Sequence, residues 1–244
     1  MLIKVINPNT TWTMTEKIGE CARSVAGVDT EIRAVSPPMG PASIESHYDE
    51  ALAVPGVLTE IARGEREDVD GYVLACIGDS GLDAARELAS GPVVAIAEAG
   101  MKMATCLGRG FCVVTPLQRT VGRAWDLAAH YGMRESCRNV NAREIPVLEM
   151  DVPGSPAREV ITAECARAVA EDDCDVNVLG CAGMADLARQ ISGRIGGPVV
   201  DGIAAATTMV QSLVTMGLTT STRCEFATPR AKNVRGLLSD FALT

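Results

Sequence analysis

Two cysteines occupy matching places in an internal repeat of the sequence. Cys76 ends the segment EDVDGYVLAC, and Cys181 ends DDCDVNVLGC, 105 residues further along. In both segments an apolar run typical of a buried strand leads to the cysteine. Two similar halves usually pack about a pseudo-twofold axis and open equivalent strand ends onto one crevice, so we expect the two thiols to face each other. Such a pair could take a proton from one face of a carbon atom and return a proton to the other face.

A glycine-containing turn follows each cysteine and leads toward a helix. We expect this turn to expose each thiol to the crevice, and backbone N–H groups at the helix start to lower the thiol pKa below its usual value of about 8.5. A buried structural role is the ordinary interpretation of a single cysteine, and a disulfide is the second alternative. The repetition at both strand ends favours a functional pair, and cytosolic redox conditions disfavour the disulfide.

Polar loops follow the first strand of each half. Asn7 to Thr11 follows IKVI, and Thr115 to Thr120 follows FCVV. The first loop could cap the helix that begins near Trp12. Alternatively, both loops face each other across the crevice and hydrogen bond to amide or carboxylate groups. Backbone N–H groups at the Gly78 and Gly183 turns, with Asn9 or Thr115, could also stabilise an enolate oxygen.

The segment Gly78-Asp79-Ser80-Gly81 superficially matches the surroundings of a serine-protease nucleophile. The alternating α/β context argues against that interpretation, and no motif places His47 or His130 as a general base. We expect instead that Asp79 or Ser80 caps the helix starting at Leu82. His47 stands where a loop enters a helix, so a surface role, a capping role and a crevice contact all remain open.

Strand and helix patterns alternate along the whole chain. We expect strands at 2–8, 31–37, 71–76, 92–96, 111–116, 140–148, 176–181 and 198–202, and helices at 12–26, 48–64, 82–89, 97–107, 118–131, 156–171, 182–193 and 203–216. This alternation predicts an α/β fold with two pseudo-symmetric lobes, each a parallel four-stranded sheet flanked by helices, and an active site between the lobes. We expect residues 1–108 with a C-terminal segment from about 203 to 244 to form lobe 1, and residues 109–202 to form lobe 2.

Composition narrows the possible partners. The formal charge of −9 argues against binding to a nucleic-acid backbone. The nine cysteines form no Cys-x-x-Cys pair, and two histidines cannot make a histidine-rich site, so no metal site is expected. No nucleotide-binding glycine loop, membrane span or signal peptide is evident. We therefore expect a cytoplasmic protein without cofactor or membrane partner.

Several longer stretches resemble one known family, the hydantoin and allantoin racemases of the aspartate/glutamate racemase superfamily. The matching stretches are INPNTT with MTEKI after it, PASIESHYDEA, LACIGDSGLDAARELA, GPVVAIAEAG, VLGCAGMADLARQ and PVVDGIAAA. The resemblance implies a cofactor-independent racemase, a homo-oligomer, that inverts a cyclic ureide through two catalytic cysteines matching Cys76 and Cys181. We expect the substrate-binding residues to be Asn9, Ile44, Ile77, Gly78, Asp79, Thr115, Pro116, Ala182 and Gly183.

The chain also departs from its relatives in ways that concern the substrate. Glutamate racemases carry Asn-Thr and Thr-His after their two cysteines, whereas this chain has Ile77-Gly78 and Ala182-Gly183, which suits a less polar, uncharged ring. Hydantoin racemases usually carry Phe and Pro where this chain has Ile77 and Ser80. The alternatives are an enzyme like arylmalonate decarboxylase or maleate isomerase on the same fold, or a non-catalytic metabolite-binding module. The decarboxylase needs only one thiol, and the binding module needs neither.

Overall fold

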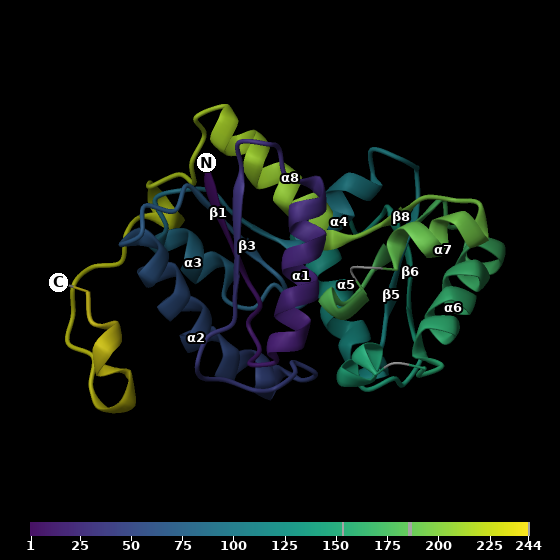
Figure 1. The fold of residues 1–244 in the computed structure, drawn as a ribbon, viewed down its shortest axis with the longest axis horizontal. Helices are drawn as coiled ribbons and strands as arrows, with labels where there is room; N and C mark the ends of the chain where they lie inside the picture. The colour runs from purple at the N-terminus through teal and green to yellow at the C-terminus, as the bar shows by residue number, and fades with distance from the viewer. Residues whose placement is uncertain (153, 185–186, 244) are drawn as a thin grey trace.

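The strands form two separate parallel sheets in a computed structural model that describes residues 1–152, 154–184 and 187–243. The strand order is β2-β1-β3-β4 in the first sheet and β6-β5-β7-β8 in the second, so each sheet repeats the plan of the other. The two sheets belong to two lobes that lie side by side (Figure 1). The strands are β1 (Leu2–Ile6), β2 (Glu31–Val35), β3 (Gly71–Leu74), β4 (Val93–Ala95), β5 (Phe111–Thr115), β6 (Cys137–Ala142), β7 (Val176–Leu179) and β8 (Val199–Val200).

The α-helices that cover these sheets mostly follow the expected pattern. They are α1 (Trp12–Val25), α2 (His47–Glu65), α3 (Leu82–Leu88), α4 (Ile96–Ala104), α5 (Val121–His130), α6 (Ala157–Glu171), α7 (Ala188–Ile195) and α8 (Gly202–Thr215). Short 3-10 turns are η1 (Gln118–Thr120), η2 (Val147–Asp151), η3 (Ala182–Met184), η4 (Cys224–Phe226) and η5 (Gly236–Phe241). The predicted α/β architecture with two four-stranded parallel sheets is confirmed.

The central strands are apolar because helices cover both of their faces. Every residue of β3, β5 and β7 is buried. Lys4 in β1 is a buried exception, and its ammonium lies 3.0 Å from the Glu60 carboxylate. On one side of the first sheet, α2 and α3 contribute Val57, Ile61 and Leu82 to a separate apolar cluster. The main core extends from α1 and α4 into the second lobe.

Helix α8 follows the second sheet in sequence but packs against α1, α4, β3 and β4 of the first lobe. Gly202 permits this crossing, because a Cβ there would lie 2.6 Å from the carbonyl oxygen of Ile96. Figure 1 shows α1, α4 and α8 between the two sheets. We propose on this basis that residues 1–108 and the segment from about 203 form lobe 1, with 109–202 as lobe 2.

Two expected elements differ from the structure. The strand expected near 140–148 is β6, at 137–142, and η2 follows at 147–151. Ile145, in the irregular segment after β6, and Val147, at the start of η2, pack into the core without forming a strand, and Pro146 has no N–H group to pair in a ladder. The helix expected at 182–193 is also replaced in part: η3 follows Cys181 directly, and α7 begins at Ala188. Residues 185 and 186 lie outside the described residues.

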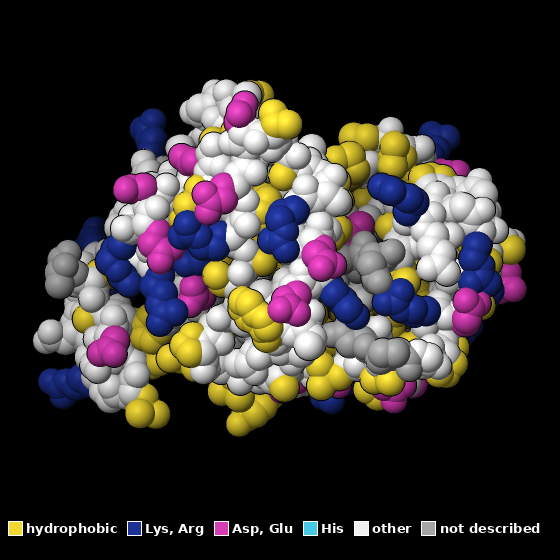
Figure 2. Space-filling view, viewed as in Figure 1, with side chains coloured by type: hydrophobic (Ala, Val, Ile, Leu, Met, Phe, Trp, Pro, Cys, Tyr) yellow, Lys and Arg dark blue, Asp and Glu magenta, His cyan; other side chains and the backbone are white. Residues whose placement is uncertain are grey.

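Acidic and basic side chains intermingle on the face shown in Figure 2. Within the part of the chain that the structure describes, no helix is both long and apolar enough to cross a membrane.

Candidate active site

The two cysteines follow equivalent central strands and begin equivalent turns. Cys76 comes after β3, where the Ala75 N–H donates to the Ile6 carbonyl at 2.8 Å, and Cys181 comes after β7, where the Gly180 N–H donates to the Val114 carbonyl at 2.7 Å. Each cysteine carbonyl then accepts from the N–H three residues later, at 3.0 Å for Cys76 and 3.1 Å for Cys181. The sequence repeat therefore corresponds to a repeat of backbone geometry.

Two adjoining cavities lie at these strand ends. The inner cavity is lined by both thiols, and it shares Ile44, Cys76, Ile77, Thr115 and Thr120 with an outer cavity. The expected site residues that line one cavity or both are Asn9, Ile44, Cys76, Ile77, Gly78, Thr115, Pro116, Cys181 and Ala182. All nine cysteines of the chain are thiols. Residues from the two halves of the chain thus enclose one site.

Gly78 and Gly183 differ in how they contact the sulfur of the preceding cysteine and in whether they line a cavity. The Gly78 N–H donates to the Cys76 sulfur. A Cβ at Gly78 would lie 2.5 Å from Oε1 of Glu50, so the Glu50 side chain would have to move to admit one. Gly183 lies beside Cys181, where a Cβ would be 3.6 Å from the sulfur, but it lines neither cavity. The Gly78 N–H is therefore a hydrogen-bond donor to the Cys76 sulfur, and not only a possible donor to a ligand.

The structure places Asp79 away from both cavities, contrary to its expected place among the substrate-binding residues. Its carboxylate accepts hydrogen bonds from the N–H groups of Ala97 and Glu98, each at 3.0 Å. The expected cap of α3 is also wrong, since Gly81 precedes that helix and no side chain caps it. Asp79 instead caps α4, and the Ser80 hydroxyl is buried without a hydrogen-bond partner among the described residues. A left-handed backbone at Asp79, with φ of 48°, turns its side chain to this use.

The pKa of Cys76 is raised, not lowered as expected. Burial is the main cause that raises it to about 12; the Gly78 N–H acts in the opposite direction, and the neighbouring Cys181, Asp79 and Glu50 add smaller raising effects. The expectation fails because α3 begins only at Leu82, so a single turn amide, not a helix terminus, reaches the sulfur. Near neutral pH the resting Cys76 side chain is therefore a thiol.

The polar loops meet at the inner cavity and are held by internal hydrogen bonds. Oδ1 of Asn9 accepts from Nδ2 of Asn7 at 3.0 Å and from the Thr11 N–H at 2.9 Å. The hydroxyls of Thr115 and Thr120 are 2.7 Å apart. The first loop therefore organises the approach to α1 and also contributes Asn9 to the cavity wall.

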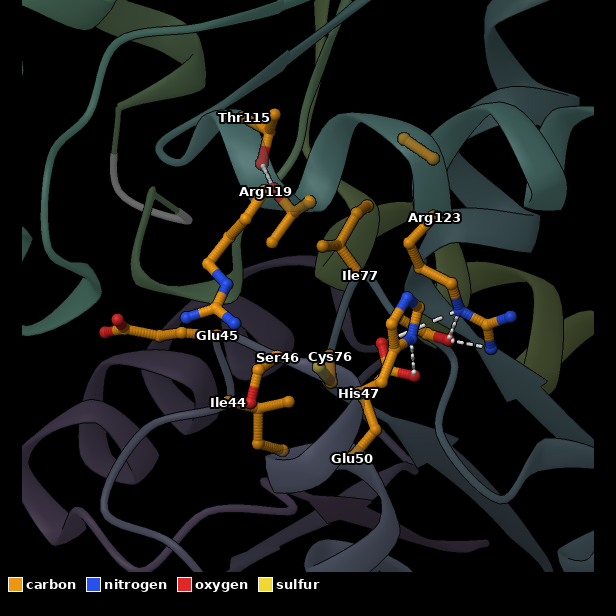
Figure 3. A pocket seen from close by; sticks show the side chains of 13 residues that line it. Ile44, Glu45, Ser46, His47, Glu50, Cys76, Ile77, Thr115, Arg119 and Arg123 are labelled. Carbon is orange, nitrogen blue, oxygen red and sulfur yellow. Dashed lines mark hydrogen bonds and ion pairs between the residues drawn. The ribbon is translucent and has the colours of Figure 1, made fainter.

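Several charged and polar residues of the outer cavity are not among the expected substrate-binding residues, although His47 and the loop from Thr115 to Thr120 were open as crevice contacts. They are Glu45, Ser46, His47, Glu50, Thr120, Arg119 and Arg123. Figure 3 shows Arg119 and Arg123 approaching from one side and Glu45, His47 and Glu50 from the other. Arg123 donates to the Gly78 carbonyl at 2.6 Å. Positions 119 and 123 are one turn apart after the Thr115 loop, and this i,i+4 spacing was a signal for a shared face.

His47 is the first residue of α2, and Ser46 caps the helix by accepting from the Asp49 N–H. The imidazole is largely exposed, lies 3.7 Å from the Glu50 carboxylate and lines the outer cavity. Among residues 1–152, 154–184 and 187–243, no three His, Cys, Asp or Glu side chains are grouped to hold a metal ion.

Comparison with known proteins gives a consistent result over nearly the whole chain. Residues 3–210 match the model of the family described as Asp/Glu/Hydantoin racemase. The chain is 45% identical over 241 residues to a hydantoin racemase of Pseudomonas sp. (strain NS671), covering 99% of this chain and 97% of that protein. It is 42% identical to a hydantoin racemase of Rhizobium meliloti, covering 97% and 98%.

Solved structures extend the comparison to the fold. An allantoin racemase from Klebsiella pneumoniae superposes with a TM-score of 0.97 at 46% identity, with 99% of each chain covered. Arylmalonate decarboxylase has the same fold at a TM-score of 0.61 and only 17% identity, with 93% of this chain and 97% of that chain covered.

Proposed function

Because the chain belongs to the Asp/Glu/hydantoin racemase family and is an isomerase of the racemase type, we propose that it racemises a cyclic ureide. The substrate is a 5-substituted hydantoin or allantoin, and the reacting atom is the ring carbon that carries the substituent. The observation that carries this proposal is that Cys76 and Cys181, from equivalent turns of the two lobes, line one cavity.

The proposed reaction uses the two thiols as one base and one acid. The thiolate of one cysteine takes the proton from the ring carbon, so that the C–H bond breaks and an S–H bond forms. The electron pair is delocalised into the adjacent carbonyl as an enolate. The opposite thiol then gives its proton to the other face of the carbon and becomes the thiolate. No atom is gained or lost, and the enzyme ends with its proton on the other sulfur.

The raised pKa of Cys76 suits this chemistry. A thiol with a pKa of about 12 keeps its proton near neutrality and is ready to act as the acid. After it has given its proton to the enolate carbon, the same sulfur is a thiolate and can act as the base toward the opposite enantiomer. It is then a stronger base than an ordinary thiolate, because basicity rises with pKa. The Asn9 amide and the Thr115 hydroxyl lie at the inner cavity and are the side chains that we propose for contact with the ring.

Among cyclic ureides we favour allantoin. The outer cavity combines apolar surface from Ile44 and Ile77 with the Arg119 guanidinium and the Glu50 carboxylate. A ureido substituent has a carbonyl that can accept from a guanidinium and N–H groups that can donate to a carboxylate. An alkyl or aryl substituent would leave these charged groups without a partner from the substrate. The decarboxylase alternative is not favoured, because it needs only one of the two thiols.

Polarimetry on single enantiomers tests the proposal. The wild-type protein should abolish the optical rotation of at least one ureide among allantoin, 5-isobutylhydantoin and 5-benzylhydantoin. Cys76→Ser and Cys181→Ser should each lower the rate by about 100- to 10,000-fold, which is the usual contribution of general acid–base catalysis. Cys106→Ser, at an exposed cysteine outside both cavities, is the matched control and should retain the wild-type rate. A serine variant at position 76 or 181 that racemises at the wild-type rate would refute the two-thiol reaction.

A further inference from the structure

A hydrogen bond joins the two lobes directly behind the Cys76 turn. The hydroxyl of Tyr131, at the end of α5 in the second lobe, donates to Oδ2 of Asp79, which is three residues after Cys76 in the first lobe. Asp79 is only 4% exposed. The two residues are 52 positions apart in sequence and come from different halves of the repeat.

Asp79 connects three elements at once through its backbone N–H and its carboxylate. Its N–H donates to the Cys76 carbonyl and closes the turn, while its two carboxylate oxygens accept from the first turn of α4. The Tyr131 hydroxyl adds the contact with α5. Any shift of α5 relative to α4 is therefore transmitted to the turn that carries the Cys76 sulfur.

Among the residues that the structure describes, the turn after the second cysteine has no counterpart of this carboxylate. Met184 holds the position in the Cys181 turn that Asp79 holds in the Cys76 turn, as their equivalent backbone hydrogen bonds show. Met184 is apolar and fully buried. At this equivalent position one turn thus has a buried carboxylate and the other an apolar side chain, although the backbone hydrogen bond of the turn is repeated.

Hydrogen bonds, rather than opposite charges, partly offset the burial of Asp79. Glu98, one of the residues whose N–H it accepts, is paired with Arg86 and Lys102, each at 2.6 Å. The pKa of Asp79 is raised to about 7, chiefly by burial and also by the Glu98 charge, although the hydrogen bonds from the Tyr131 hydroxyl and the two α4 N–H groups act to lower it. The pKa of Tyr131 lies far above its usual range because of burial and the Asp79 charge, so the tyrosine remains the donor.

From these contacts we infer that Asp79 and Tyr131 form an interlobe contact that positions Cys76 against the ring carbon. Both are positioning residues, because neither lines the cavities with the thiols. The inference rests on the proposed function in assigning a catalytic role to Cys76. A displacement of a reacting group by about 1 Å can lower a rate about 100-fold, so a contact of this kind can govern kcat without touching the substrate.

Tyr131→Phe tests the inference, with Tyr72→Phe as a matched control. Tyr72 also donates from a buried ring to a carboxylate, Glu65 at 2.6 Å, but both partners belong to the first lobe and lie outside the site. We expect Tyr131→Phe to lower kcat on allantoin by about 10- to 100-fold with KM within about twofold of wild type. Tyr72→Phe should leave kcat unchanged, although both variants lower the melting temperature.

A second measurement is independent of racemase activity. Alkylation by iodoacetamide, followed at each cysteine by mass spectrometry, should show a Cys76 to Cys181 rate ratio that changes at least about threefold in Tyr131→Phe but not in Tyr72→Phe. Asp79→Ala combined with Tyr131→Phe should be no slower than the slower single variant, because the two residues act as one unit. A Tyr131→Phe protein with wild-type kcat and an unchanged alkylation ratio would overturn the inference. A wild-type protein inactive on every ureide would instead refute the proposed function, and the alkylation ratio would still report on the contact.

Discussion

Cys76 and Cys181 have equivalent backbone positions but different surroundings. The Cys76 turn contains a buried carboxylate, Asp79, and faces Glu50, whereas the Cys181 turn has Met184 at the corresponding place. Negative charge near a thiol disfavours its thiolate. The two cysteines can therefore serve equivalent roles as base and acid in different surroundings. We expect Cys76 to be the protonated one of the two before substrate binds.

Ile77 is the residue through which substrate preference is most directly tested. It lines both cavities and stands where the related hydantoin racemases carry Phe. Ile77→Phe should change the ratio of kcat/KM between allantoin and 5-benzylhydantoin by about 10- to 200-fold, because a pocket of altered volume discriminates by about 1 to 3 kcal/mol. Steady-state kinetics on both substrates measures the ratio.

Ile195→Phe provides the matched control for this substitution. Ile195 is also partly buried and packs on the core, but from α7 and outside both cavities. An equal change of the ratio in both variants, or no change in Ile77→Phe, would show that Ile77 does not select the substituent.

At the level of elements, the sequence predicted the strands well because buried parallel strands are short apolar runs bounded by glycine or polar residues. The ends of β3 and β7, and with them the two cysteines, followed directly from the repeat. The segment after β6 is not a strand although its apolar residues predict one, because core residues such as Ile145 are apolar in irregular backbone too. Apolarity reports burial, and only regular spacing reports the type of element.

The side-chain contacts of Asp79 could not be predicted in the same way. A carboxylate before a helix usually caps that helix, but a left-handed backbone at Asp79 directs the carboxylate to α4, which is near in space and distant in sequence. The pKa of Cys76 differs from the expectation for a related reason, since burial outweighs one local N–H. Arg119 and Arg123 had a local signal in their spacing, but their approach to the Cys76 turn depends on how the lobes pack.

The raised pKa of Asp79 predicts that the stability of the protein depends on pH. Its pKa is about 7 in the folded protein and 3.8 without the fold, so between these values the folded state holds a proton that the unfolded state has lost. The contribution of Asp79 to stability is therefore greatest below about pH 4 and decreases as the pH rises to about 7. Asp79→Asn should remove this decrease. The free energy of unfolding of the variant, relative to that of wild type, should therefore rise by at most about 4 kcal/mol between about pH 4 and about pH 7.

Urea unfolding of wild type and Asp79→Asn between pH 4 and pH 8 measures this difference. Asp83→Asn, at an exposed position on α3, is the control for the amide substitution. A difference between wild type and Asp79→Asn that stays constant over this range would contradict the pKa assigned to the buried carboxylate.

At the scale of the whole molecule, the two similar lobes supply the two groups that inversion at carbon requires. Inversion at carbon needs an acid and a base on opposite faces, and a repeated strand-turn unit supplies one thiol from each lobe. Helices α1, α4 and α8 lie between the sheets and join the lobes through a continuous core. The relative placement of the thiols is thus a property of lobe packing as well as of the local turns.

Solvent deuterium exchange in the two serine variants tests this two-thiol account most directly. Each variant keeps one base, so in D2O it should exchange the ring C–H of one allantoin enantiomer without inverting it, and the other variant should exchange only the opposite enantiomer. Exchange is followed by NMR on each pure enantiomer, with the enzyme-free rate subtracted. Opposite selectivity in Cys76→Ser and Cys181→Ser is the predicted result. Exchange of the same enantiomer by both variants, or inversion at the wild-type rate by either, would contradict it.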